Sequence, residues 1–270
     1  MKCYKQASIF ILFLINFITN ISHQQSFDEE DKKFAIEHLK EFGYLSSSYL
    51  SSSNASQMSN EELENAIRIF QKYFHLNVTG KLNDETVKQM NKSQCGNKDF
   101  GDEKIDLRIG DGIFTGHFTG NKWGKKNLTY YIRAYQPKIV KNLTATKANG
   151  KVVYYNATID YTPEQIDQIL RNGFNKWIKY TTLTFTQVFN PLNYNDYDIE
   201  ILFAYGNHGP DDHDEFDGDG YHYAHAAHTL YDSHIHFDYE DWDVDQFMLQ
   251  HVATHEMGHV LGLHHNDVCH

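Results

Sequence analysis

Cysteine is scarce in this chain of 270 residues, with only Cys3, Cys95 and Cys269 present. Cys3 lies in an N-terminal segment that we expect to be removed, so the mature chain keeps two thiols. Two thiols are too few for the disulfide framework of a small secreted domain. Cys95 is therefore a lone thiol, half of a single bridge, or a metal ligand.

Basic residues are also few, with 24 Lys and Arg against 36 Asp and Glu and a formal net charge of −12. A phosphate-binding surface needs a stripe of Lys and Arg, so we do not expect nucleic acid as a partner. An acidic surface suits calcium, which takes oxygen ligands. The length and the 40% hydrophobic content allow one full domain and a smaller one.

Long apolar runs are absent except at the N-terminus, where the basic start MKCYKQ leads into SIFILFLINFITNIS. This run is short for a membrane span and has the pattern of a secretory signal peptide, which we place at residues 1–23. No other membrane span is predicted. Six sequons agree with secretion to the cell wall or matrix and are candidate glycosylation sites: Asn54, Asn77, Asn91, Asn127, Asn142 and Asn156.

Residues 24–112 are predicted to form a small three-helix domain. Apolar residues recur at helical spacing over 28–42, and two further helices begin near Ser59 and Asn83. Ser59 and Glu62 have the spacing of a capping box. The polar, Gly-rich stretch 96–112 is interpreted as a linker.

Residues 113–270 are predicted to form an α+β domain. Strands are expected over 128–135, 182–188 and 198–205, and a helix begins at Thr162-Pro163. The Asn-, Lys- and Thr-rich insertion before that helix is interpreted as a solvated loop. Strands separated by a long helix predict a mixed, largely parallel sheet with helices packed on it.

Histidine is abundant, with 17 residues that cluster after position 208. His255 and His259 are four residues apart on a predicted helix, so both can bind one zinc ion. Gly262 lets the chain turn so that His265 becomes a third ligand. Three ligands leave the open position of a catalytic zinc, where Glu256 would act as general base on a zinc-bound water. The alternative is a His-rich surface.

A second cluster, residues 208–241, combines imidazoles with carboxylates placed among glycines. Imidazoles suit zinc, whereas carboxylates and carbonyls suit calcium. The alternative is an acidic, His-rich loop that binds metal weakly or not at all.

These motifs resemble those of the matrixins, the matrix metalloproteinases of the metzincin clan. HEMGHVLGLHH matches the metzincin zinc signature, MNKSQCGNKD is similar to the family's propeptide switch Pro-Arg-Cys-Gly-x-Pro-Asp, and AIRIFQKYFHLNVTGKLNDETVKQM resembles its peptidoglycan-binding-like prodomain. The plant matrixins are the most similar. The resemblance implies a metzincin-like catalytic domain with a mixed, mostly parallel five-stranded sheet, preceded by a three-helix prodomain.

The resemblance also implies a latent form in which Cys95 is the fourth zinc ligand and excludes water. Cys95, Gly96 and Asp99 match the family's switch, whereas Gln94 stands where the family has Arg. In the family this Arg pairs with the motif's Asp, so Asp99 needs another partner here.

Metal sites in the second cluster are implied in the same way. A structural zinc would be bound by three family-matched histidines and one carboxylate: His208, Asp211, His225 and His236. Asp212 is the alternative carboxylate, because Pro210 occupies the position where the family has Asp. A calcium ion would be bound by side chains and backbone carbonyls of Asp217, Gly218, Gly220, Asp238 and Asp241. The stretch YAHAAH would be the edge strand along which a peptide substrate lies antiparallel.

We therefore expect a secreted, monomeric zinc endopeptidase, made as a latent zymogen, that hydrolyses peptide or protein substrates outside the cell. The sequence stops five residues after His265, without the Met-turn and last helix of matrixins. A catalytically impaired zinc-binding decoy is therefore an alternative, as is a wall-binding module led by the helical domain.

Overall fold

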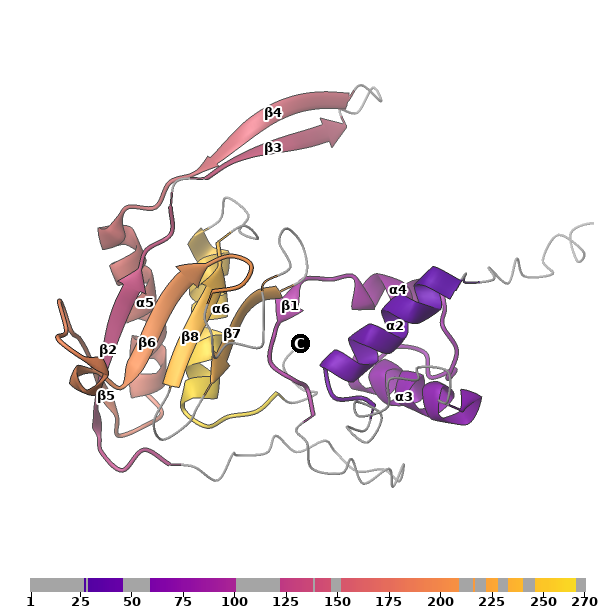
Figure 1. The fold of residues 1–270 in the computed structure, drawn as a ribbon, viewed down its shortest axis with the longest axis horizontal. Helices are drawn as coiled ribbons and strands as arrows, with labels where there is room; N and C mark the ends of the chain where they lie inside the picture. Colours follow the sequence, from indigo (N-terminus) through magenta and orange to yellow (C-terminus); the bar gives the residue numbers. More distant parts are fainter. Residues whose placement is uncertain are drawn as a thin grey trace, which may run out of the picture.

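The computed structural model describes residues 27, 29–45, 59–100, 122–137, 139–146, 152–208, 216, 222–227, 233–239 and 246–265. Figure 1 shows the N-terminal helices α2, α3 and α4 beside a sheet that packs with α5 and α6, and the short strand β1 lies between the two groups. The predicted signal peptide at 1–23 lies outside the described residues.

The N-terminal helices are α2 (Glu29–Glu41), α3 (Asn60–Tyr73) and α4 (Asp84–Met90). The predicted capping box is confirmed at the start of α3: Ser59 Oγ accepts a hydrogen bond from the Glu62 backbone N–H, and the Glu62 carboxylate accepts one from Ser59 N. The helices bury an aromatic-rich core whose fully enclosed members include Leu39, Phe42, Phe70, Tyr73 and Met90.

The main sheet consists of β1 (Gln94–Cys95), β2 (Asn127–Ala134), β5 (Thr184–Gln187), β6 (Ile199–Ala204), β7 (His222–Ala227) and β8 (Ser233–Asp238). The strand order is β1-β7-β8-β6-β2-β5, and every neighbouring pair is parallel except β7 with β8. The predicted mixed, mostly parallel five-stranded sheet is confirmed for β2 and β5 to β8. β1 adds a sixth strand at the free edge of β7.

Helices α5 (Pro163–Ile178) and α6 (Gln246–Val260) pack on the sheet and share one core with it. The predicted start of α5 is confirmed, since Thr162 caps it in a reciprocal box with Gln165. A Cβ atom at Gly173 would lie 2.9 Å from Met257 Sδ, so this glycine permits the close approach of α5 to α6. The short 3-10 helix η3 (Tyr194–Asp196) lies between β5 and β6.

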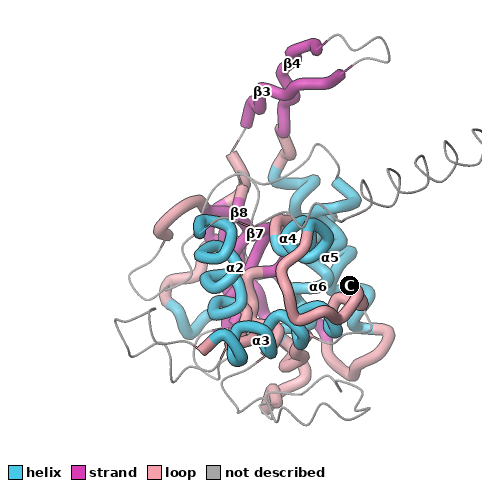
Figure 2. Tube along the Cα trace, turned by 90° about the vertical axis from the view of Figure 1, so that its right-hand side faces the viewer, coloured by secondary structure: helices cyan, strands magenta, loops and turns pink. Residues whose placement is uncertain are grey.

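The insertion between β2 and α5 is an antiparallel hairpin of β3 (Ile139–Thr146) and β4 (Val152–Ile159), so the prediction of a loop there was wrong. The two strands pair along their whole length, from Ile139 with Ile159 to Thr146 with Val152. Their β-branched and aromatic residues favour strands more strongly than the polar composition suggested. The hairpin projects from the rest of the protein in both views (Figures 1 and 2).

A search of the described helices for a membrane-spanning segment gave none, because no helix there is both long and apolar enough.

Candidate metal centre

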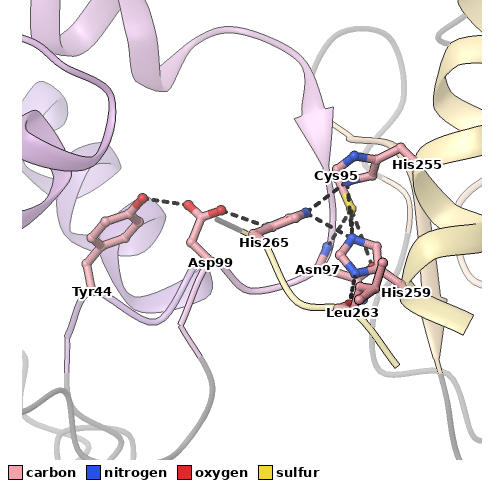
Figure 3. Close-up of polar contacts among 8 residues, drawn as sticks. All are labelled: Tyr44, Cys95, Asn97, Asp99, His255, His259, Leu263 and His265. Atoms are coloured by element: carbon pink, nitrogen blue, oxygen red, sulfur yellow. Dashed lines mark hydrogen bonds and ion pairs between the residues drawn. The ribbon is translucent and has the colours of Figure 1, made fainter. Parts of the chain in front are cut away.

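Three histidines converge at the C-terminal end of α6. His255 and His259 project from α6, and the chain leaves the helix through Gly262 at φ +92°, in the left-handed region that favours glycine. This turn brings His265 back toward the helix. The Nε2 atoms of the three rings lie 3.0 to 3.1 Å from one another (Figure 3).

The Nδ1 contacts of His259 and His265 explain why the Nε2 atoms of these two rings point toward the centre of the cluster. His259 Nδ1 lies 2.8 Å from the Leu263 carbonyl, and His265 Nδ1 lies 2.8 Å from Asp99 Oδ1. Both acceptors require a proton on Nδ1, which leaves a lone pair on Nε2. Burial also lowers the pKa of His259, which favours the neutral ring. Lone pairs facing one another at 3.0 Å repel unless a cation lies between them.

Zinc fits this donor set. Tetrahedral coordination at about 2.0 to 2.1 Å would separate two ligating nitrogens by about 3.3 Å, close to the spacing of the three Nε2 atoms. Imidazole nitrogens are donors that zinc prefers. The three histidines could therefore bind one zinc ion with small adjustments of their side chains.

Cys95 supplies a fourth donor from the helical domain. Its Sγ lies 3.5 Å from His259 Nε2, and the four candidate ligand atoms all lie within 4.8 Å of one another. The thiol is free of any disulfide. Burial and the nearby Glu256 carboxylate raise its pKa well above the usual range. A divalent cation at the histidines is the kind of partner that would stabilise the thiolate in this position.

The segment around Cys95 docks on the edge strand β7. β1 pairs with β7 in parallel, and Gly96 N donates to the Ala224 carbonyl at 2.8 Å. The Asn97 side-chain amide extends the strand pairing by binding the backbone of Ala226 as a paired strand would. Its Nδ2 donates to Ala226 O at 2.6 Å, and its Oδ1 accepts from Ala226 N at 2.8 Å. The first residues of the predicted linker 96–112 are thus held against the sheet.

Glu256 lies on α6 beside the zinc-ligand candidates. Its side chain is fully buried, and the Cys95 thiol lies beside its carboxyl group. Burial raises the pKa of Glu256 to about 8, against a smaller lowering by the Cys95 thiol. A carboxylate in this environment is costly without a partner, which is typical of a catalytic acid or base.

The second candidate zinc site is only partly described. His225 Nε2 and His208 Nε2 each lie 3.1 Å from His236 Nδ1, and these three residues form a cluster of possible metal ligands. Asp238, a predicted calcium ligand, is buried at the end of β8. The other predicted ligands of both sites lie outside the described residues: Asp211, Asp217, Gly218, Gly220 and Asp241.

The candidate glycosylation sites fall into three groups. Asn77, Asn91 and Asn127 are exposed. Asn142 and Asn156 are direct cross-strand partners in the β3–β4 hairpin. Asn54 lies outside the described residues. All six remain predictions.

Two contacts with the helical domain were not expected from the sequence. The Tyr44 hydroxyl donates to Asp99 Oδ2 at 2.6 Å, which supplies the partner that Asp99 needs in the absence of the family's Arg. His222 on β7 is buried, and its Nε2 lies 3.2 Å from Glu41 Oε1 on α2. No local sequence pattern could predict either contact, because each joins residues far apart in the sequence.

Comparisons with known proteins agree with these features. Residues 146–270 match the matrixin family model, and residues 30–90 match the model described as a putative peptidoglycan binding domain. The chain is 31% identical over 223 residues to matrix metalloproteinase-16 of Rattus norvegicus, covering 77% of this chain and 32% of that protein. It is 30% identical over 253 residues to metalloendoproteinase 5-MMP of Arabidopsis thaliana, covering 86% of this chain and 61% of that protein.

Interstitial collagenase of Bos taurus is 30% identical over 246 residues, with 88% of this chain and 44% of that protein covered. The chain thus spans about a third to three fifths of the length of these curated relatives. The helical domain and the zinc-signature domain are both represented in the matches. The chain belongs to the matrixin family.

Proposed function

We propose that this chain is a secreted zinc endopeptidase made as a latent zymogen. The observation that carries this proposal is the convergence of three imidazole Nε2 atoms at 3.0 to 3.1 Å beside the buried Glu256 on α6. The matrixin match over residues 146–270 supports the same reaction class. Substrates would be peptide bonds of extracellular proteins.

Zinc, when bound by His255, His259 and His265, supplies a Lewis acid and lowers the pKa of water. Glu256 would accept the proton of the attacking water and pass it to the leaving amine. Its raised pKa, about 8 through burial, suits a group that must both take and return a proton near neutral pH. The Leu263 carbonyl would hold His259 in the required tautomer.

The free edge of β7 would position the substrate. In the latent form Gly96 and Asn97 make hydrogen bonds with the backbone groups of Ala224 and Ala226. Removal of the helical domain would expose these groups to an extended peptide, which would add a strand to the sheet. The resemblance to matrixins implies an antiparallel orientation for that peptide, opposite to the parallel pairing of β1 with β7.

Latency would come from Cys95 as the fourth ligand, so that activation requires removal of the helical domain. That domain would then act as an inhibitory prodomain rather than as a wall-binding module, because it carries the strand that places Cys95 at the histidines. A structural zinc at His208, His225 and His236, completed by Asp211, and a calcium ion at Asp217, Gly218, Gly220, Asp238 and Asp241 belong to the same proposal.

The test is peptide hydrolysis by purified zinc-loaded protein before and after removal of the helical domain. We expect turnover only after removal, and we expect Glu256→Ala to abolish it while zinc content stays unchanged. Glu164→Ala, at an exposed position in the first turn of α5, is the matched control and should keep full activity. Zinc binding without turnover in the processed parent protein would instead support a non-catalytic decoy.

A further inference from the structure

Asp99 connects the helical domain directly to a candidate zinc ligand. One carboxylate oxygen, Oδ1, accepts from His265 Nδ1 at 2.8 Å, and the other, Oδ2, accepts from the Tyr44 hydroxyl at 2.6 Å. Figure 3 shows these residues in a continuous chain from Tyr44 through Asp99 to His265 and the other histidines. The side chains of Asp99 and His265 are each only 5% exposed, so water competes little for this pair.

Tyr44 and its neighbours fix the position of Asp99. Tyr44 is buried, with its ring against Phe70, Tyr73 and Phe100 at centroid distances of 5.1 to 6.0 Å. The Phe42 carbonyl accepts from the backbone N–H groups of Asp99 and Phe100 at 3.1 and 3.3 Å. The segment that follows α2 therefore holds Asp99 through both its backbone and its side chain.

Gln94, which replaces the family's Arg, does not take this role. Its Nε2 donor has no hydrogen-bond partner among the described residues. The donor to Asp99 comes instead from Tyr44, 55 residues earlier in the chain. Every second residue from Cys95 to Asp99 thus contacts the zinc-signature domain. Cys95 lies at His259, Asn97 binds the backbone of β7, and Asp99 binds His265.

We propose that Asp99 is a positioning residue of the latent form, which orients His265 for zinc from the helical domain and is itself held by Tyr44. The inference rests on the proposed function. A carboxylate that accepts from Nδ1 fixes the tautomer and orientation of a ligating imidazole and raises its basicity. Removal of the helical domain would then remove both the Cys95 thiol and the carboxylate that accepts the hydrogen bond of His265. The metal site would lose both contacts with the helical domain in one step.

The test is the rate at which a maleimide modifies Cys95 in the zinc-loaded full chain, with the modified site identified by peptide mass spectrometry. Loss of the charge-assisted bond in Asp99→Asn should accelerate modification roughly 10- to 100-fold. Tyr44→Phe, which keeps the ring and removes only the hydroxyl, should give a smaller acceleration. Glu41→Gln, which removes only the charge from the half-exposed contact with His222, away from the histidine cluster, is the control and should change the rate less than about threefold.

Cobalt substitution gives a second readout that a purely structural role would not move. We expect Asp99→Asn, but not Glu41→Gln, to shift the d–d absorption of bound cobalt, because the environment of His265 changes. Equal modification rates and equal spectra for the Asp99 and Glu41 variants would overturn the inference. A parent protein that binds neither zinc nor cobalt would instead contradict the proposed function. If Asp99→Asn does not fold, Tyr44→Phe decides by the same two measurements.

Discussion

Asn97→Ala should loosen the hold of the helical domain on β7. The Asn97 amide makes two hydrogen bonds with the backbone of Ala226, at 2.6 and 2.8 Å. Neutral hydrogen bonds contribute about 1 kcal/mol each, so the variant should lose about 2 kcal/mol of docking free energy. This value corresponds to a roughly 30-fold increase in the fraction of molecules in which the segment has left the site.

The rate of Cys95 modification in the zinc-loaded full chain measures that fraction when opening and closing are fast compared with modification. The variant keeps the backbone N–H of Asn97, 3.4 Å from Cys95 Sγ, and loses the weaker contact of Cys95 Sγ with Asn97 Oδ1 at 3.5 Å. Asn195→Ala, at an exposed position in η3, is the control. A rate for Asn97→Ala within twofold of the parent would refute the view that this side chain contributes to docking.

Three further predictions concern the fold around the site. Gly262→Ala should weaken zinc binding and destabilise the protein by about 1 to 2 kcal/mol, because φ is +92° there; zinc titration and urea unfolding measure both effects. Thr162→Ala should cost about 1 kcal/mol in the unfolding of the sheet domain through loss of the α5 cap, whereas Ser59→Ala should cost about as much in the helical domain only. The pKa of His38 is lowered to about 4, mainly by burial. Since the unfolded imidazole takes up a proton near pH 6.5, the stability of the helical domain should fall as pH drops from about 6.5 to about 4, by about 2 kcal/mol between pH 7 and pH 5. His38→Phe should flatten this dependence in urea titrations, and an unchanged pH dependence in that variant would contradict the assignment.

Local patterns were sufficient for much of the fold. The capping residues Ser59 and Thr162 mark the helix starts correctly, since a cap depends on side chains within three residues. The alternation over 128–135 predicts β2, whose burial alternates accordingly. The spacing of His255, His259 and His265, with Gly262 between them, is likewise local, and the structure brings the three rings together.

Contacts over long sequence distances could not be predicted. Tyr44 meets Asp99 across 55 residues and Asp99 meets His265 across 166, and no periodicity marks either pair. The pairing of β1 with β7 also depends on two segments from different halves of the chain. The β3–β4 hairpin is a different case, because its strand-forming residues were present but its polar composition and sequons were given more weight.

X-ray absorption at the zinc edge of the full chain, compared with Cys95→Ser, tests the central claim most directly. The account predicts a sulfur shell at about 2.3 Å in the parent protein. That shell should disappear in Cys95→Ser, while the nitrogen shell from the histidines remains. A parent spectrum without sulfur, or a sulfur shell that persists in Cys95→Ser, would contradict a zinc ion held jointly by the three histidines and Cys95.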